Sequence, residues 1–188
     1  MTEPFPEAIA PISTDRLLLR KMAATDVDWV WELDQDPEVM RHITGGVPTP
    51  REVTEKVHMP RLLQSHSAGS AFGFWAALDR DTGVPLGWFH MRPERLPPFE
   101  MELGYRLRRD AWGRGLATEG SRKLIDLTLH HWGQLRVAAR TLAGNLASRR
   151  VMEKCGLVWE RDFHYPEEWL PGWPEDRRQA VRYLIERR

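Results

Sequence analysis

Apolar and polar positions follow two different periods along the chain, and together they predict a mixed α/β domain. Between Glu100 and Leu107 apolar and polar residues alternate strictly, as in a strand with one buried face. From Arg114 to Trp132 apolar residues recur every three or four positions, as in a long amphipathic helix. Shorter apolar runs predict further strands at residues 16–20, 71–78, 84–91, 135–141, 157–163 and 179–185.

Helix-start signals place the remaining helices. One helix is expected to begin at Thr25, which acidic residues follow. A second start is expected at Asp36, a capping residue followed by a proline and then an acid. A capping box at Thr49 predicts a third helix, which runs to about Gln64. A shorter helix is expected over Ala147–Lys154, where a glycine follows. Strands and helices in this order predict an α/β (α+β) domain, with one mixed sheet and about four helices on its faces. Residues 1–12 are expected to form a tail and residues 13–188 a single domain.

Composition narrows the function classes. The chain has 188 residues, 27 Lys+Arg, 27 Asp+Glu and one Cys. This length suits one domain with its own core, and a single cysteine excludes an internal disulfide framework. Zero net charge argues against a generic nucleic-acid binder. No run approaches the roughly 18 apolar residues of a membrane span, and the N-terminus does not resemble a signal peptide, so a cytoplasmic protein is expected. The histidines lack metal-ligand spacing, so no metal is expected.

A strand, a glycine-containing turn and a long helix follow one another over residues 107–119. Backbone amides at a helix start lack internal partners, and glycines such as Gly113 and Gly115 allow an anion to approach them closely. Arg108, Arg109 and Arg114 add positive charge. The segment therefore predicts a phosphate site, with an ordinary helix start as the alternative.

Four segments carry a family resemblance through their order and spacing. They are Thr14–Arg20, Glu102–Tyr105, Trp112–Glu119 and Asn145–Leu157. With these segments the chain resembles the GNAT acetyltransferase superfamily, within it the RimJ/RimL-like branch of ribosomal-protein-alanine N-acetyltransferases. The resemblance implies a GNAT fold with a mostly antiparallel sheet of six to seven strands. It also implies acetyl-CoA bound between two splayed strands, here Glu100–Leu107 and Leu135–Thr141.

The resemblance further implies how acetyl-CoA is held. The pyrophosphate would bind the amides of residues 113–118, the pantetheine would pair with the backbone near Leu107, and a second contact would lie at the start of the short helix. The implied cofactor-binding residues are Leu107, Arg108, Arg109, Gly113, Arg114, Gly115, Leu116, Ala117, Thr118, Asn145 and Ser148.

Two positions depart from the family pattern. Asp110 stands where the family usually has glutamine or arginine, and it is expected to point away from the pyrophosphate, as a helix cap. Met152 stands where many members have a tyrosine that acts as general acid. Methionine cannot donate a proton, so that role is vacant or filled by another residue.

The implied reaction is direct transfer of acetyl from acetyl-CoA to a primary amine, which requires a neutral amine and a proton acceptor. Glu102 is the expected catalytic base, through water, with a solvent-facing carboxylate as the alternative. Glu100 shares its face and is assigned to the substrate side. Ser148 either donates a proton to the thiolate or orients the cofactor and caps a helix. Trp29 and Trp31 either line the acceptor pocket or pack on the sheet.

Charge is distributed unevenly along the chain. Residues 106–150 have a basic excess, whereas Met22–Met40 contains six acids and no base. A cation-deficient acceptor side and a cation-rich cofactor side are therefore expected. The acceptor is a protein N-terminus, a small amine or an antibiotic, and nucleic acids and membranes are not expected partners. The sequence is compatible with a homodimer but does not determine the oligomeric state. The alternative function is a catalytically silent acyl-CoA-binding or regulatory module, which Met152 favours.

Overall fold

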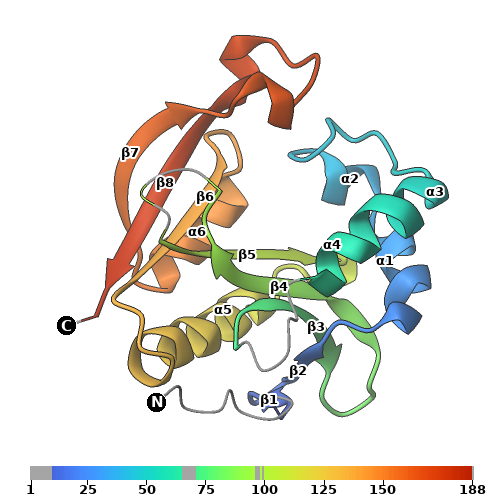
Figure 1. The fold of residues 1–188 in the computed structure, drawn as a ribbon, viewed down its shortest axis with the longest axis vertical. Coiled ribbons are helices and arrows are strands. Elements are labelled where there is room, and N and C mark those ends of the chain that lie inside the picture. Colours follow the sequence, from blue (N-terminus) through green and yellow to red (C-terminus); the bar gives the residue numbers. More distant parts are fainter. Residues whose placement is uncertain (1–9, 65–70, 96–97, 99, 188) are drawn as a thin grey trace, which may run out of the picture.

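The computed structural model describes residues 10–64, 71–95, 98 and 100–187, and Figure 1 shows its arrangement. One eight-stranded sheet runs through the domain in the order β1-β2-β3-β4-β5-β6-β8-β7. Only the β5–β6 pair is parallel, and the other neighbouring strands are antiparallel. The strands are β1 (Ile12–Ser13), β2 (Leu17–Lys21), β3 (Gly73–Asp79), β4 (Pro85–Pro93), β5 (Met101–Leu107), β6 (Arg136–Leu142), β7 (Val158–His164) and β8 (Gln179–Glu186).

The predicted mixed sheet is confirmed, with one strand more than expected. The extra strand is the two-residue β1, whose Ile12 falls at the end of the expected tail and pairs with Leu19. Short strands of this kind carry too little periodicity to be recognised. Residues 1–9 of the expected tail lie outside the described residues.

Helices cover both faces of the sheet (Figure 1). The described residues form six α-helices where about four were expected, partly because a π-helical turn divides the helix expected from Thr49 to Gln64 into two. The helices are α1 (Val27–Leu33), α2 (Pro37–Met40), α3 (Arg51–Val53), α4 (Met59–Gln64), α5 (Leu116–Asp126) and α6 (Leu146–Lys154). A π-helical turn joins α3 to α4, and another extends α5 through residues 127–131. Among the described residues, none of these helices is long and apolar enough to cross a bilayer.

Side-chain caps account for the starts of α2 and α6, and two other predicted starts are wrong. Asp36 caps α2 by accepting a hydrogen bond from the Glu38 amide at 2.9 Å, as expected. The helix expected at Thr25 begins instead at Val27, after a 3₁₀ turn. Thr49 makes no capping box, because α3 begins after Pro50 without a side-chain cap.

Two apolar clusters lie on opposite faces of the sheet. Strand alternation separates them, since Trp75 belongs to one cluster and its neighbours Phe74 and Ala76 to the other. The first contains residues of α5 and α6, and the second contains residues of α1, α2 and α4. We call these the α5 face and the α4 face.

The two central strands diverge along their length. β5 and β6 pair from Met101↔Val137 to Leu103↔Ala139, and no further pair follows. Beyond this splay point, residues 104–107 present to β6 an edge without a neighbouring strand. Such an opening lets an extended ligand lie between two strands of one sheet and hydrogen-bond to the free backbone groups.

Candidate functional site

The turn before α5 has the geometry of an anion site. Gly113 and Gly115 adopt φ values of 72° and 79°, which favour glycine, and Gly115 caps α5 without any side-chain hydrogen bond. The first amides of α5 are therefore free to bind a ligand. A Cβ added to Gly113 would meet no atom within 4 Å, so the backbone there is open to a phosphate.

An arginine from the N-terminal strand region braces this turn. Arg16 donates from Nε to Glu119 Oε2 at 2.7 Å and from Nη1 to the Arg114 carbonyl at 2.8 Å. Thr14 Oγ1 donates to Glu119 Oε1 at 2.6 Å. Although burial opposes the effect, these bonds hold the pKa of Glu119 below its ordinary value. Sequence reasoning missed this role, and the signal was the shared resemblance of the segments that contain Arg16 and Glu119.

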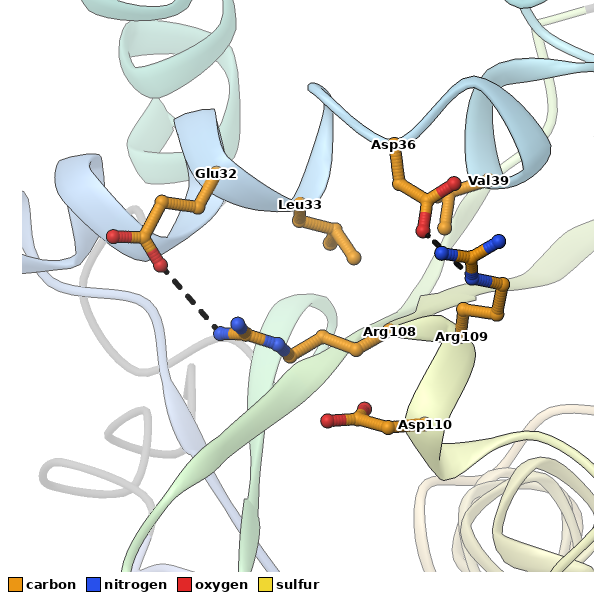
Figure 2. A pocket seen from close by; sticks show the side chains of 7 residues that line it. All are labelled: Glu32, Leu33, Asp36, Val39, Arg108, Arg109 and Asp110. Atoms are coloured by element: carbon orange, nitrogen blue, oxygen red, sulfur yellow. Dashed lines mark ion pairs between the residues drawn. The ribbon is translucent and has the colours of Figure 1, made fainter.

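Arg108 and Arg109 leave the end of β5 toward α1 and α2 rather than toward the α5 turn. Arg108 pairs with Glu32 at 3.6 Å and Arg109 with Asp36 at 3.1 Å. The four side chains line a hollow of about 220 Å³. Figure 2 shows the arginines reaching across it to the two carboxylates.

Asp110 also lines this hollow, and its expected role as a helix cap is wrong. It lies in the 3₁₀ turn at residues 109–111, whereas Gly115 caps α5. The carboxylate thus lies beside the arginines of the hollow, six positions before α5 begins.

The start of α6 joins the splayed part of β5. Asn145 caps α6, with Oδ1 accepting from the Ser148 amide at 3.2 Å. The Ser148 hydroxyl lies 3.0 Å from the Tyr105 hydroxyl, and burial raises the pKa of Tyr105 above its ordinary value. Met152 is buried in the core of the α5 face. Asn145 and Ser148 thus lie together beside the splayed end of β5. Tyr105 lies next to them and was not among the predicted site residues.

On the α4 face, the carboxylate of Glu102 is held between two guanidinium groups. Arg92 Nη2 lies 2.8 Å from Glu102 Oε2, and Arg140 Nη2 lies 3.1 Å from Oε1. Glu102 is buried, so the alternative of a solvent-facing carboxylate is wrong. His90 lies beside it, with Nε2 4.0 Å from Oε2.

Glu100, just before β5, belongs to a second set of ion pairs, with arginines on β6 and β8. It pairs with Arg136 at 3.1 Å and with the buried Arg182. Arg182 also contacts Glu94 at 3.0 Å, and both side chains are only 1% exposed. These ion pairs link β5, β6 and β8 on the α4 face. The carboxylate of Glu100 is therefore already bound to arginines and is not free to bind the amine substrate.

Trp29 and Trp31 have different surroundings. Trp29 is buried in the α4-face cluster and donates from Nε1 to Asp26 Oδ1 at 2.8 Å, so it packs on the sheet. Trp31 is partly exposed beneath the Arg51 guanidinium, 5.3 Å from its ring centroid. Of the two, only Trp31 presents a surface to a ligand.

The expected cation-deficient acceptor side is wrong. Every acid of Met22–Met40 is paired with an arginine, and in four of the six pairs the arginine lies more than 20 positions away in sequence. The pairs are Asp26–Arg20, Asp28–Arg51, Glu32–Arg108, Asp34–Arg106, Asp36–Arg109 and Glu38–Arg41. Asp34 is fully buried; although burial opposes the effect, His58 and Arg106 keep its pKa below the ordinary value.

A second hollow lies at the far end of β6. It has a volume of about 240 Å³ and is lined by residues after α2, by residues 142–144 and by the loop before β8. The ends of both diverging strands therefore open into hollows. In the part of the chain that the structure describes, no group of His, Cys, Asp and Glu residues could hold a metal ion.

Comparison with known proteins assigns this architecture. The family model described as an acetyltransferase (GNAT) domain matches residues 16–158. The chain is 30% identical over 183 residues to the FsC-acetyl coenzyme A-N(2)-transacetylase of Aspergillus fumigatus, covering 94% of this chain and 76% of that protein.

Solved structures show the same fold. A GNAT-family acetyltransferase from Bacillus anthracis superposes with a TM-score of 0.76 at 22% identity, covering 95% of this chain and 99% of that one. Spermidine N-acetyltransferase from Vibrio cholerae, in complex with CoA and spermine, superposes with a TM-score of 0.69 at 18% identity, covering 93% and 97%. The family uses acetyl-CoA as cosubstrate, and this chain is an acetyl-CoA-dependent N-acetyltransferase that belongs to the GNAT acetyltransferase family.

Proposed function

We propose that the chain transfers acetyl directly from acetyl-CoA to a primary amine that enters from the α4 face. The splay of β5 from β6 beyond Leu103 and Ala139 carries this proposal, since it opens a passage from the anion site toward the α4 face. Acetyl-CoA supplies the activated acetyl group as a thioester. The amine nitrogen bonds to the acetyl carbon as the carbon–sulfur bond breaks.

The proposed cofactor contacts follow the free backbone groups. The amides of residues 113–118 receive the pyrophosphate, with Arg114 close by, and the free edge of β5 up to Leu107 pairs with the pantetheine. Asn145 and Ser148 at the start of α6 form the second contact. Leu116, Ala117 and Thr118, in the first turn of α5, are proposed to contact the pyrophosphate through their backbone amides.

Arg108 and Arg109 require a rearrangement if they are to bind phosphate. Both are occupied by Glu32 and Asp36 across the hollow in Figure 2. Their pairs are partly exposed, so exchanging a carboxylate for a phosphate involves little loss of free energy. We propose that acetyl-CoA draws these arginines from α1 and α2 and so loosens the contacts that α1 and α2 make with β5.

The acceptor is proposed to be an amine without additional positive charges. Arg61 and Arg95 form no ion pair with any described residue, and each lies near Arg92 on the α4 face. Burial and these like charges lower the pKa of Arg61 to about 10. A polycation entering here would be repelled, whereas an amine that also carries a carboxylate, such as an amino acid or an acidic peptide N-terminus, would be attracted.

Catalytic roles are proposed for residues near the splay point. Glu102 lies on the strand that the resemblance assigns to the cleft, and its ion pairs to Arg92 and Arg140 hold its carboxylate at the splay point, as a base or as a group that positions one. Ser148 and Tyr105 share a hydrogen bond beside the cleft, which offers a hydroxyl route to the departing thiolate in place of Met152. The RimJ/RimL-like branch, a cytoplasmic location and a homodimer remain proposals from the sequence.

Release of free CoA thiol over a panel of amines tests this function. The panel contains amino acids, peptides with acidic or basic N-termini, aminoglycosides and spermine. We expect release above background with at least one amine that carries no additional positive charge. Tight acetyl-CoA binding by calorimetry, with no acceptor raising thiol release, would support the silent binding module instead.

A further inference from the structure

His90 on β4 lies at the splay point on the α4 face. Its register partner is Gly104, the first β5 residue beyond the last pair with β6. A methyl group on Gly104 would come within 2.4 Å of His90 Cε1 and 2.6 Å of Nε2. The imidazole therefore lies directly over the Gly104 backbone, in the space that any other residue would fill with its side chain.

The ring is held in place by aromatic contacts, and among the described residues its nitrogens have no hydrogen-bond partner. Phe74 packs edge-on at a centroid distance of 5.1 Å, and Trp88 stacks at 6.0 Å. Both ring nitrogens are buried, and neither forms a hydrogen bond with any described residue. A buried polar atom without a partner costs about 1–3 kcal/mol, and both nitrogens are therefore available to a ligand or a water that reaches the ring.

Charged groups from every neighbouring element face the imidazole. They are Arg92 on β4, Glu102 on β5, Arg140 on β6, Arg61 on α4 and Arg95 after β4. Burial, together with the four arginines, lowers the pKa of His90 well below its ordinary value. The imidazole is therefore neutral near pH 7, which is the form that accepts a proton.

We propose that His90 accepts the proton of the acceptor amine during acetyl transfer, directly or through one water. The carboxylate of Glu102 is neutralised by two guanidinium groups, whereas the nitrogens of His90 form no hydrogen bond with any described residue. Glu102 is then a positioning residue, whose negative charge 4.0 Å away stabilises the imidazolium as it forms.

The step balances without any further reactant. The neutral amine attacks the acetyl carbon, the carbon–nitrogen bond forms, and the amine proton moves to His90. The carbon–sulfur bond then breaks. The thiolate takes a proton through the Ser148 and Tyr105 hydroxyls, which solvent reprotonates, and the imidazolium releases its proton to solvent, which leaves N-acetyl product, CoA thiol and neutral His90. An acceptor that arrives as an ammonium ion first releases one proton to solvent. This inference rests on the acetylation of an amine by this site.

His90→Ala with imidazole rescue tests the proposal. We expect kcat to fall about 10²-fold or more, as for loss of a general base, with acetyl-CoA affinity by calorimetry unchanged. Added imidazole should raise the kcat of this variant at least tenfold, which a merely structural role of His90 would not allow. The matched control is His130→Ala, an exposed histidine in the turn after α5, for which we expect wild-type turnover.

Glu102→Gln separates the two residues. If His90 is the base, this variant keeps more turnover than His90→Ala, and the acid limb of its pH–rate profile moves to lower pH because a negative charge near the imidazole is lost. Turnover of His90→Ala within twofold of wild type, or a loss that imidazole does not restore, would overturn the proposal. Failure of the acetylation function itself would appear differently, as a wild-type protein without turnover for any amine, in which case slow acetyl-CoA hydrolysis by water serves as the readout for the same variants.

Discussion

Arg16 and Glu119, 103 positions apart in sequence, join the N-terminal segment to the first turn of α5. Arg16 contacts the carboxylate through its backbone amide at 2.8 Å and through Nε at 2.7 Å, and it also binds the carbonyl of Arg114 in the turn. The loop that presents the free amides is therefore shaped by a residue that precedes β2. A change in this pair should affect acetyl-CoA binding as well as stability.

Glu119→Gln should weaken acetyl-CoA binding several-fold and lower stability by about 1 kcal/mol. The Arg16 side chain is 49% exposed, so solvent screening limits the contribution of the pair. Calorimetry gives the affinity and thermal unfolding gives the stability, with Glu52→Gln as control because Glu52 pairs with Lys56 far from the turn. Equal affinities in the two variants would contradict the role of the brace.

Gly113→Ala should reduce acetyl-CoA affinity at least tenfold. The positive φ strains an alanine, and its methyl group would occupy the open space above the amides. Gly83→Ala is a matched control, since Gly83 has φ +73° and equally free surroundings, but lies in the β3–β4 turn. The two variants should lose similar stability, by about 1 kcal/mol, and differ in affinity. Similar affinities would place the phosphate elsewhere.

Glu32→Gln combined with Asp36→Asn should strengthen acetyl-CoA binding at low salt. The change frees Arg108 and Arg109 from their carboxylate partners, and the gain should shrink as salt screens the phosphates. Asp28→Asn is the control, because Asp28 pairs with Arg51 on another helix. Unchanged affinity, measured by titration at two salt concentrations, would show that these arginines do not contact the cofactor.

Arg182→Met should destabilise the protein by about 3–5 kcal/mol. The variant leaves the buried Glu94 with only one remaining arginine neighbour, Arg140 at 3.5 Å, and an insufficiently compensated buried charge is strongly unfavourable. Denaturant unfolding measures the loss. Arg136→Met, which removes an exposed partner of the same Glu100, should change stability little. Comparable losses in the two variants would mean that burial of the charge is not the cause.

Stability should fall at acidic pH partly through His90. Its folded pKa is depressed, so the unfolded chain binds the proton more readily, and stability present above about pH 6.5 is lost as pH falls toward the folded pKa. The loss approaches about 1.4 kcal/mol per pH unit in that window. Urea unfolding at pH 7.5 and 5.5 should show a smaller decrease for His90→Gln than for wild type. Equal decreases would mean that His90 titrates normally.

Elements with a strong period could be predicted from the sequence. The alternation in Glu100–Leu107 and the stripe of Arg114–Trp132 became β5 and α5, and the glycines between them adopt positive φ values. The true start of α1 at Val27 could not be predicted. The Asp26 carboxylate accepts hydrogen bonds from the Ala23 amide and from Arg20, and so closes a 3₁₀ turn before the α-helix begins.

The candidate site was less predictable than the fold, because its charges are satisfied by distant partners. Glu102 was recognised from its strand, yet its neighbours Arg92 and Arg140 lie on two other strands. The position of His90 in the sequence shows no metal-ligand spacing, and what places it at the splay point is its register with Gly104 across two strands. Spacing along one segment contains no information on which residues face each other across a sheet.

The order of strands also determines when the cleft can be completed during synthesis. β6 forms one arm of the cleft, and its outer edge pairs over its whole length with β8, the last strand of the chain. While the ribosome still holds residues 179–186, β6 has an unpaired edge, and β7 has no paired strand among the residues that the structure describes. The nascent chain therefore exposes strand edges that can pair wrongly until β8 emerges and pairs with both β6 and β7.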